Sequence, residues 1–268
     1  FRAMFITTLI AFVPAAAPAE ATPSILQPLN SSIAALVAPQ DAAMESASEW
    51  TGSVALSAIS TDGNTETQSF NFDSSAELRE DVDRYTFKAY LNYGTDSASG
   101  DSVLTQRKMG TSLQYDYFLD EAETTYVYSN VAADYDALAD LDMRLTFGAG
   151  GGYQFYERED SKLSGELGLG YVTEDFEGSP SDDYISLRAA FNTFKRINED
   201  LTFTSSGQIL PSLEESDDII AKLDSKLSMS LSEAMFTSFQ WVIDYDNTPS
   251  GDNDRVDKRF VLSLGWSF

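Results

Sequence analysis

The stretch RFVLSLGWSF, residues 259–268, decides the fold. Along it, apolar side chains alternate with polar or small ones, and Val261 is the exception. An alternation of period two predicts a β-strand with one apolar face. That face carries Phe260, Leu262, Leu264, Trp266 and Phe268. A sheet that closes into a barrel has no free edge, so in such a barrel we expect this last strand to pair with the first.

The same alternation recurs from Trp50 onward. It is clearest in residues 83–94, 142–156, 162–173, 183–194 and 219–231. Together with weaker segments, these runs predict about twelve strands of about ten to fifteen residues. Ordinary soluble strands have about five or six residues, whereas a tilted strand that crosses a membrane needs at least about nine to eleven. The lengths therefore favour a membrane-spanning sheet.

The connections between these runs alternate in length. Short ones are expected at 79–83, 120–123, 157–161, 197–200 and 232–234, and longer ones at 94–101, 136–142, 174–183, 211–218 and 246–256. Only the first hairpin, around 60–67, breaks the pattern. An up-and-down barrel with short periplasmic turns and long outer loops has this alternation. The predicted fold is an all-β, up-and-down antiparallel transmembrane β-barrel of about twelve strands.

The apolar faces can point inward, as in a soluble barrel, or outward to lipid. About twelve strands enclose an interior that single side chains do not fill. The polar faces carry few bulky apolar residues, which favours apolar faces turned to lipid. Aromatic residues near the predicted strand ends resemble interfacial girdles. They are Tyr85, Tyr93, Tyr115, Tyr117, Tyr171, Tyr184, Tyr245 and Trp266.

The carboxy-terminal strand also resembles the assembly signal of bacterial outer-membrane proteins. That resemblance implies recognition by the outer-membrane assembly machinery. Outer-membrane lipid is the other expected partner, because the apolar faces turn toward it. Gly265 departs from the pattern, because the small residue is expected earlier in the signal.

The start of the predicted barrel resembles a known family. WTGSVALSAISTDGNTETQSF (50–70) is similar to the opening of the YdiY-like family of salt-induced outer-membrane proteins, and so are GELGLGYV (165–172) and the terminal GWSF. The matching positions are Trp50, Gly52, Gly63, Asn64 and Thr65. The resemblance implies an outer-membrane barrel of unknown biochemical role and supplies no catalytic residues. Physically, Gly63-Asn64 is a hairpin signal, because both residues tolerate positive φ.

The amino terminus resembles an export signal. Arg2 precedes the apolar run MFITTLIAFV, and AAAPA supplies small residues for cleavage. We expect a signal peptide at 1–19, an Ala/Pro/Ser-rich periplasmic linker with a short helix at 20–49, and the barrel at 50–268. The alternative for the first run is a buried structural helix. This organisation predicts the outer membrane of a Gram-negative bacterium as the location.

Composition excludes several functions. The net charge is −26, with 43 acidic and 17 basic residues, so nucleic acid is not an expected partner. The chain has no His and no Cys, which removes His-based triads, thiolate nucleophiles and His or Cys metal sites. We therefore expect a non-enzymatic protein without a cofactor, either a narrow pore or an envelope-stabilising barrel. An outer-membrane lipid hydrolase or protease is the alternative, and a soluble ligand-binding barrel is weaker still.

Acidic clusters occur near the predicted outer loops, at 134–142, 174–183, 214–218 and 246–254. Such clusters can bind divalent cations, but a solvated acidic rim explains them better. The glycine runs GAGGGY and GELGLGY are expected inside strands. No helix follows them, so they relieve crowding in the barrel rather than cradle a phosphate.

The polar faces carry charges of both signs. The basic residues are Lys88, Lys108, Arg144, Arg188, Lys222, Lys226 and Arg259, and the acidic ones are Asp73, Glu77, Asp116, Glu166, Asp224 and Asp244. Because the two sets nearly balance, we expect ion pairs across a narrow lumen. The expected result is small, weakly selective conductance or none, with a mild cation preference from the acidic rim.

Overall fold

The computed structural model describes residues 50–62, 66–98, 101–251 and 253–268. The predicted signal peptide and linker lie outside the described residues, and so do the hairpin residues Gly63, Asn64 and Thr65. Among the described residues, no helix is long and apolar enough to cross a membrane.

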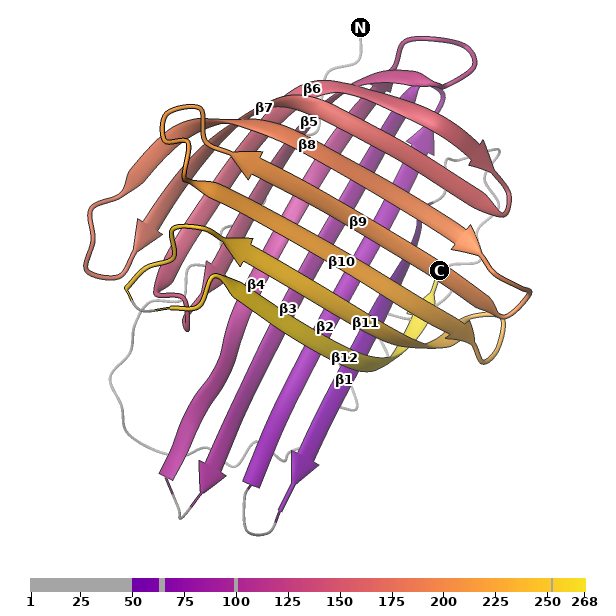
Figure 1. Cartoon of the computed structure of the whole chain (residues 1–268). Helices are drawn as coiled ribbons and strands as arrows, with labels where there is room; N and C mark the ends of the chain where they lie inside the picture. The colour runs from indigo at the N-terminus through magenta and orange to yellow at the C-terminus, as the bar shows by residue number, and fades with distance from the viewer. Residues whose placement is uncertain (1–49, 63–65, 99–100, 252) are drawn as a thin grey trace, which may run out of the picture. The chain divides into compact units, whose positions relative to one another are not determined.

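Within the described residues, twelve strands form one closed antiparallel sheet (Figure 1). The strands are β1 (Thr51–Thr61), β2 (Glu66–Glu80), β3 (Asp83–Ala98), β4 (Asp101–Phe118), β5 (Thr125–Asp136), β6 (Leu141–Arg158), β7 (Ser161–Phe176), β8 (Asp182–Arg196), β9 (Leu201–Pro211), β10 (Ile219–Ser230), β11 (Met235–Asp246) and β12 (Val256–Ser267). Each strand pairs with its neighbours in the chain, and β1 pairs with β12. The predicted up-and-down barrel of about twelve strands is confirmed.

Tight turns connect the strands at one end of the barrel, and the chain ends there as well (Figure 1). Asp120 organises the turn between β4 and β5, since its carboxylate accepts the N–H groups of Thr124 at 3.0 Å and Thr125 at 2.7 Å. The hydroxyl of Thr124 and the N–H of Thr125 together lower the pKa of Asp120. We call this end the turn end and the opposite one the loop end.

One predicted loop is instead largely strand. Residues 94–101 were expected to form a long connection, but β3 runs to Ala98 and β4 starts at Asp101. The ladder between the two strands shifts register between Gly94 and Thr95. A bulge of this kind bends a hairpin without ending it, so the strands continue through polar sequence.

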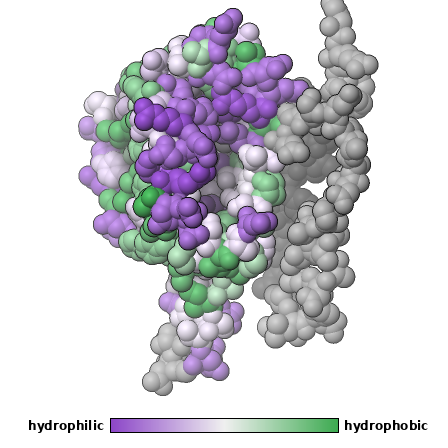
Figure 2. All heavy atoms as spheres, turned by 90° about the vertical axis from the view of Figure 1, so that its right-hand side faces the viewer, coloured by the Kyte–Doolittle hydropathy of each residue, from purple (hydrophilic) through white to green (hydrophobic). Residues whose placement is uncertain are grey.

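The inner and outer faces follow the predicted alternation. On β7, Leu167 and Leu169 are 66% and 55% exposed, whereas Glu166 on the same strand is 3% exposed. On β12 and at Phe268, which follows it, the five apolar residues of the carboxy-terminal pattern all point outward, and Val261 is buried on the inner face. Figure 2 shows hydrophilic residues gathered toward the middle of the face it views, with hydrophobic residues along the left and lower margins.

The interior holds more bulky apolar residues than the sequence analysis expected. Two buried clusters lie on the inner face, one of Val172, Tyr184, Leu210 and Ile220, and one of Phe118, Tyr126 and Tyr128. Tyr184 was assigned to an interfacial girdle, and this was wrong because Ile185 and Leu187 take the outer face of β8. Tyr184 therefore points inward, opposite Val172 on β7.

Glycines on β6 and β7 make room for the inward aromatic residues. A Cβ atom on Gly152 would overlap the ring of Tyr126, and one on Gly168 would overlap the hydroxyl of Tyr128. Glycine at these positions lets the two tyrosines lie against the neighbouring wall. The glycines thus relieve crowding inside the barrel, as expected from the glycine runs in the sequence.

Candidate functional site

The lumen carries the charged residues that the sequence pattern selected. The strand register places Lys88, Lys108, Arg144, Glu166, Arg188, Lys222, Asp224, Lys226 and Arg259 on the inner face. Asp73, Glu77, Asp116 and Asp244 lie on the same face.

Other charged side chains near the strand ends also point inward, and the sequence pattern did not predict them. They are Arg79, Arg84, Asp134, Asp136, Glu174, Asp246 and Asp257. The period-two pattern, continued into the predicted connections between strands, would have placed these charges on the inner face.

Toward the loop end, ion pairs cross the lumen. Lys108 Nζ on β4 lies 2.9 Å from Asp244 on β11 and 3.1 Å from Asp136 on β5. Arg144 on β6 pairs with Asp246 on β11 at 2.9 Å and also with Glu174 on the adjacent β7. In the ring of twelve strands, β11 lies five positions from both β4 and β6. These side chains therefore reach across the interior.

A second layer of polar contacts lies nearer the middle. Lys226 on β10 pairs across the lumen with Asp73 on β2. The side-chain amide of Gln240 donates to both carboxylate oxygens of Asp224, at 2.9 and 3.0 Å. Lys88 faces the same region and makes no ion pair with any carboxylate in the described part of the chain.

Toward the turn end, Glu166 is the centre of a buried network. Its carboxylate accepts hydrogen bonds from Arg188 at 2.7 Å, Gln114 at 2.8 Å and Tyr126 at 3.0 Å. These partners come from β8, β4 and β5, so the network joins several parts of the wall. A carboxylate removed from water needs this number of donors, because its desolvation is costly.

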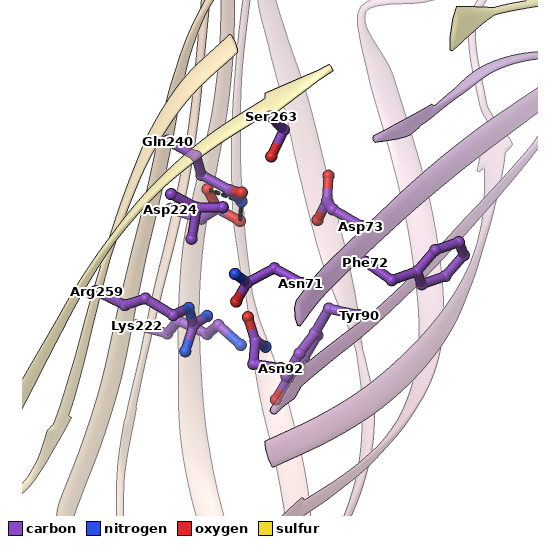
Figure 3. Close-up of a pocket in the computed structure, with 11 residues that line it drawn as sticks. Asn71, Phe72, Asp73, Tyr90, Asn92, Lys222, Asp224, Gln240, Arg259 and Ser263 are labelled. Carbon is purple, nitrogen blue, oxygen red and sulfur yellow. Dashed lines mark hydrogen bonds between the residues drawn. The ribbon is translucent and has the colours of Figure 1, made fainter. Parts of the chain in front are cut away.

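A small chamber lies between these layers, with a volume of about 20 Å3 (Figure 3). Its lining comes from β2, β3, β10, β11 and β12. Asn71 and Asn92 point into it from one wall, and Lys222 and Arg259 extend toward them from the other. Asn92 is 4% exposed, and its Nδ2 donor has no partner among the described residues.

The cations in the chamber differ in how they are held. Lys222 Nζ lies 4.3 Å from the centre of the Tyr90 ring and 3.9 Å from Asp244. Arg259 lies 6.0 Å from the same ring and forms no ion pair with the carboxylates that the structure describes. Arg259 is thus a cation of the inner face without a direct counter-ion.

The described residues contain no group of three or more acidic side chains placed to hold a metal ion. Divalent-cation binding by the acidic loops stays a prediction.

The family comparison covers the barrel. A family model described as "Protein of unknown function, DUF481" matches residues 54–268. The chain belongs to this family. The DUF481 match covers nearly the same region as the resemblance found in the sequence, and it too assigns no role. The salt-induced designation stays a prediction.

Other comparisons add little about this DUF481 protein. The search of curated proteins finds no match. An outer membrane channel from Pseudomonas putida F1 is 13% identical, with a TM-score of 0.47, over 86% of this chain and 98% of that one. The NanC porin is 8% identical, with a TM-score of 0.47, over 81% and 98%. The KdgM porin is 10% identical, with a TM-score of 0.38, over 82% and 99%. At these values the likeness carries no functional conclusion.

Proposed function

We propose that this protein is a non-enzymatic β-barrel of the outer membrane of a Gram-negative bacterium. The outer face of the closed sheet supports this proposal. Large apolar side chains cover it, among them Phe155, Leu167, Phe260 and Leu262, each at least 60% exposed. A soluble protein rarely leaves so much apolar surface in water, whereas a closed barrel satisfies its backbone in lipid. The turn end then faces the periplasm, and the acidic loops face outward.

Within the membrane, we propose a narrow pore of small conductance and weak selectivity. The observation that carries this proposal is the pair of bridges from β11, Asp244 to Lys108 and Asp246 to Arg144. Side chains that span the lumen leave room only for small solutes. Because most of the lumen cations, among them Lys108, Arg144 and Lys226, are paired with carboxylates, no ring of one charge sign selects an ion.

Planar-bilayer recording of the refolded protein tests the pore. The wild-type protein should show small, weakly selective conductance. Asp244→Asn removes a carboxylate that Lys108 and Lys222 share, so it should open the lumen and raise the conductance. Asp254→Asn, in the exposed loop before β12, is the control and should leave conductance near the wild-type value. A large, strongly anion-selective wild-type channel would contradict the proposal.

An envelope-stabilising barrel is the second candidate, favoured by the number of bridges that close the interior. It predicts no conductance in either variant and a loss of envelope integrity when the gene is deleted. An outer-membrane enzyme would instead cleave phospholipid or peptide in detergent. The salt-response link rests on the family resemblance, and it predicts that the amount of protein rises with external NaCl.

A further inference from the structure

The contact between β1 and β12, which we call the seam, is paired over only part of its length. Its ladder contains four residue pairs, from Ser53–Ser267 to Leu56–Leu264. By comparison, β1 makes eleven pairs with β2, and β12 makes eleven with β11. In Figure 1, β1 and β12 diverge from the turn end toward the loop end.

The hydrogen-bond pattern identifies the groups left without partners along the seam. Gly52 and Phe268 exchange both backbone hydrogen bonds, at 2.9 and 3.0 Å. In an antiparallel ladder such pairs recur at every second residue. Continued in the same register, the next unformed pairs are Ala58 with Leu262 and Ser60 with Phe260. An unpaired edge is costly in hydrocarbon, so we expect water from the lumen or a ligand to meet it.

The chamber lies directly behind this unpaired edge. Arg259, Val261 and Ser263 line it, and all three belong to the part of β12 that does not pair with β1. No residue of β1 contributes to the lining. The unpaired segment of β12 is thus shared between the chamber and the outer surface.

The chamber favours an anionic group. Its carboxylates are engaged, because Asp73 pairs with Lys226 and Asp224 accepts two hydrogen bonds from Gln240. Two of its donors are free, since Arg259 has no ion pair and Asn92 Nδ2 has no partner within the described residues. The oxygen Asn71 Oδ1 also lacks a partner there, but an amide can turn its N–H2 group to a ligand instead. A cavity of about 20 Å3 accepts one or two atoms of water size, which suits a carboxylate better than a phosphorylated head group.

The outer side of the same edge favours an apolar chain. Phe260 and Leu262 are 66% and 68% exposed on β12, and Ile59 is 54% exposed on β1. The chain's net charge of −26 repels an anion that approaches through the acidic loops, whereas the seam is reached from the membrane.

We propose that the unpaired part of the seam is a lateral entrance for a single-chain carboxylate amphiphile. Its carboxylate binds Arg259, Lys222 and Asn92 in the chamber, and its hydrocarbon chain lies against Phe260 and Leu262. This proposal rests on the proposed membrane location but not on ion conduction.

Dodecanoate is the probe, added to the full chain in nanodiscs of neutral phospholipid and followed by calorimetry. Saturable binding is expected for dodecanoate. Dodecyltrimethylammonium has the same chain with a cationic head, and acetate has the head without the chain, so both should bind at least about tenfold more weakly. Equal binding of dodecanoate and dodecyltrimethylammonium would overturn the proposal.

Two variants locate the site. Arg259→Gln should weaken dodecanoate binding by about tenfold or more, and Arg255→Gln, in the exposed loop, should not. Ser57→Cys with Ser263→Cys places one disulfide at the next step of the seam, where both serines face inward and are buried. The native chain has no cysteine, so oxidation should abolish binding and reduction should restore it. Unchanged binding in both variants would refute the entrance.

The edge could instead accept a strand of another polypeptide. A photocrosslinker at Phe260 would then yield a protein adduct in cells rather than a fatty-acid adduct, and this result would overturn the proposal. Conductance of the same preparation separates the two hypotheses. Saturable dodecanoate binding without conductance would refute the pore and support the lateral entrance. Conductance without dodecanoate binding would support the pore and refute the lateral entrance.

Discussion

Replacing Glu166 by glutamine would remove the carboxylate that joins the network at the turn end. Glu166 and Arg188 are 3% and 5% exposed, and the two side chains lie 2.7 Å apart. Glutamine keeps the size of the side chain and part of its hydrogen bonding to Gln114 and Tyr126. It leaves Arg188 as a buried cation without its carboxylate.

The cost can be estimated from the burial of this pair. Removing one partner of a buried ion pair costs about 3–5 kcal/mol, because the remaining charge stays desolvated. The hydrogen bonds that survive place Glu166→Gln near the lower value, about 3 kcal/mol. Glu159→Gln makes the same chemical change in an exposed pair with Arg196, where the carboxylate is 92% exposed. Exposed pairs contribute about 0–1 kcal/mol, so the control should lie within that range.

Urea unfolding of the protein in lipid vesicles, followed by tryptophan fluorescence, measures both values. Adding Arg188→Met to Glu166→Gln removes the uncompensated cation and should recover part of the lost stability, as a coupling energy of a double-mutant cycle. A Glu166→Gln variant that folds and lies within about 1 kcal/mol of wild type would refute the argument that this charge is desolvated.

Three further predictions concern topology, assembly and packing. The cysteine of Ser179→Cys should react with an impermeant reagent on intact cells, and that of Asn198→Cys should not. The reverse labelling would show that the barrel has the opposite orientation in the membrane. Phe268→Asp should lower the membrane level of the protein without blocking secretion, because it places a charge at the end of the closing strand, and normal levels would count against the assembly signal. Gly152→Ala should destabilise the barrel by about 1–3 kcal/mol in the urea assay through overlap with the ring packed on it. A Cβ atom on the outward Gly151 would meet only the backbone oxygen of Tyr126, at 3.9 Å, so Gly151→Ala should be nearly neutral.

The fold was predictable because a strict alternation determines the face of every residue once one residue of a strand is placed. This is why the outward pattern of β12 and the inward Val261 follow from a single rule. Tyr184 was misassigned because its aromatic character near a strand end was given more weight than the face set by Ile185 and Leu187. The extension of β3 to Ala98 was missed because polar residues there suggested a loop.

The charged residues of the lumen were predictable, but their partners were not. Alternation shows that Lys108 and Asp244 both point inward, yet they are distant in the sequence and come from strands on opposite sides of the ring. Which residues meet across a barrel depends on strand tilt and stagger. The chamber and the partly unpaired seam depend on the same geometry, and no local pattern in the sequence indicates them.

The bonds between Gly52 and Phe268 have a consequence for the order of folding. Every other ladder joins strands that follow one another in the chain, so each can form as a hairpin with low contact order. The seam alone joins the first strand to the last. Bringing these two strands together costs chain entropy, and this cost comes before the few bonds of the seam form. We therefore expect closure to be the slow last step, preceded by an open twelve-stranded sheet that is vulnerable to proteases along the edges of β1 and β12.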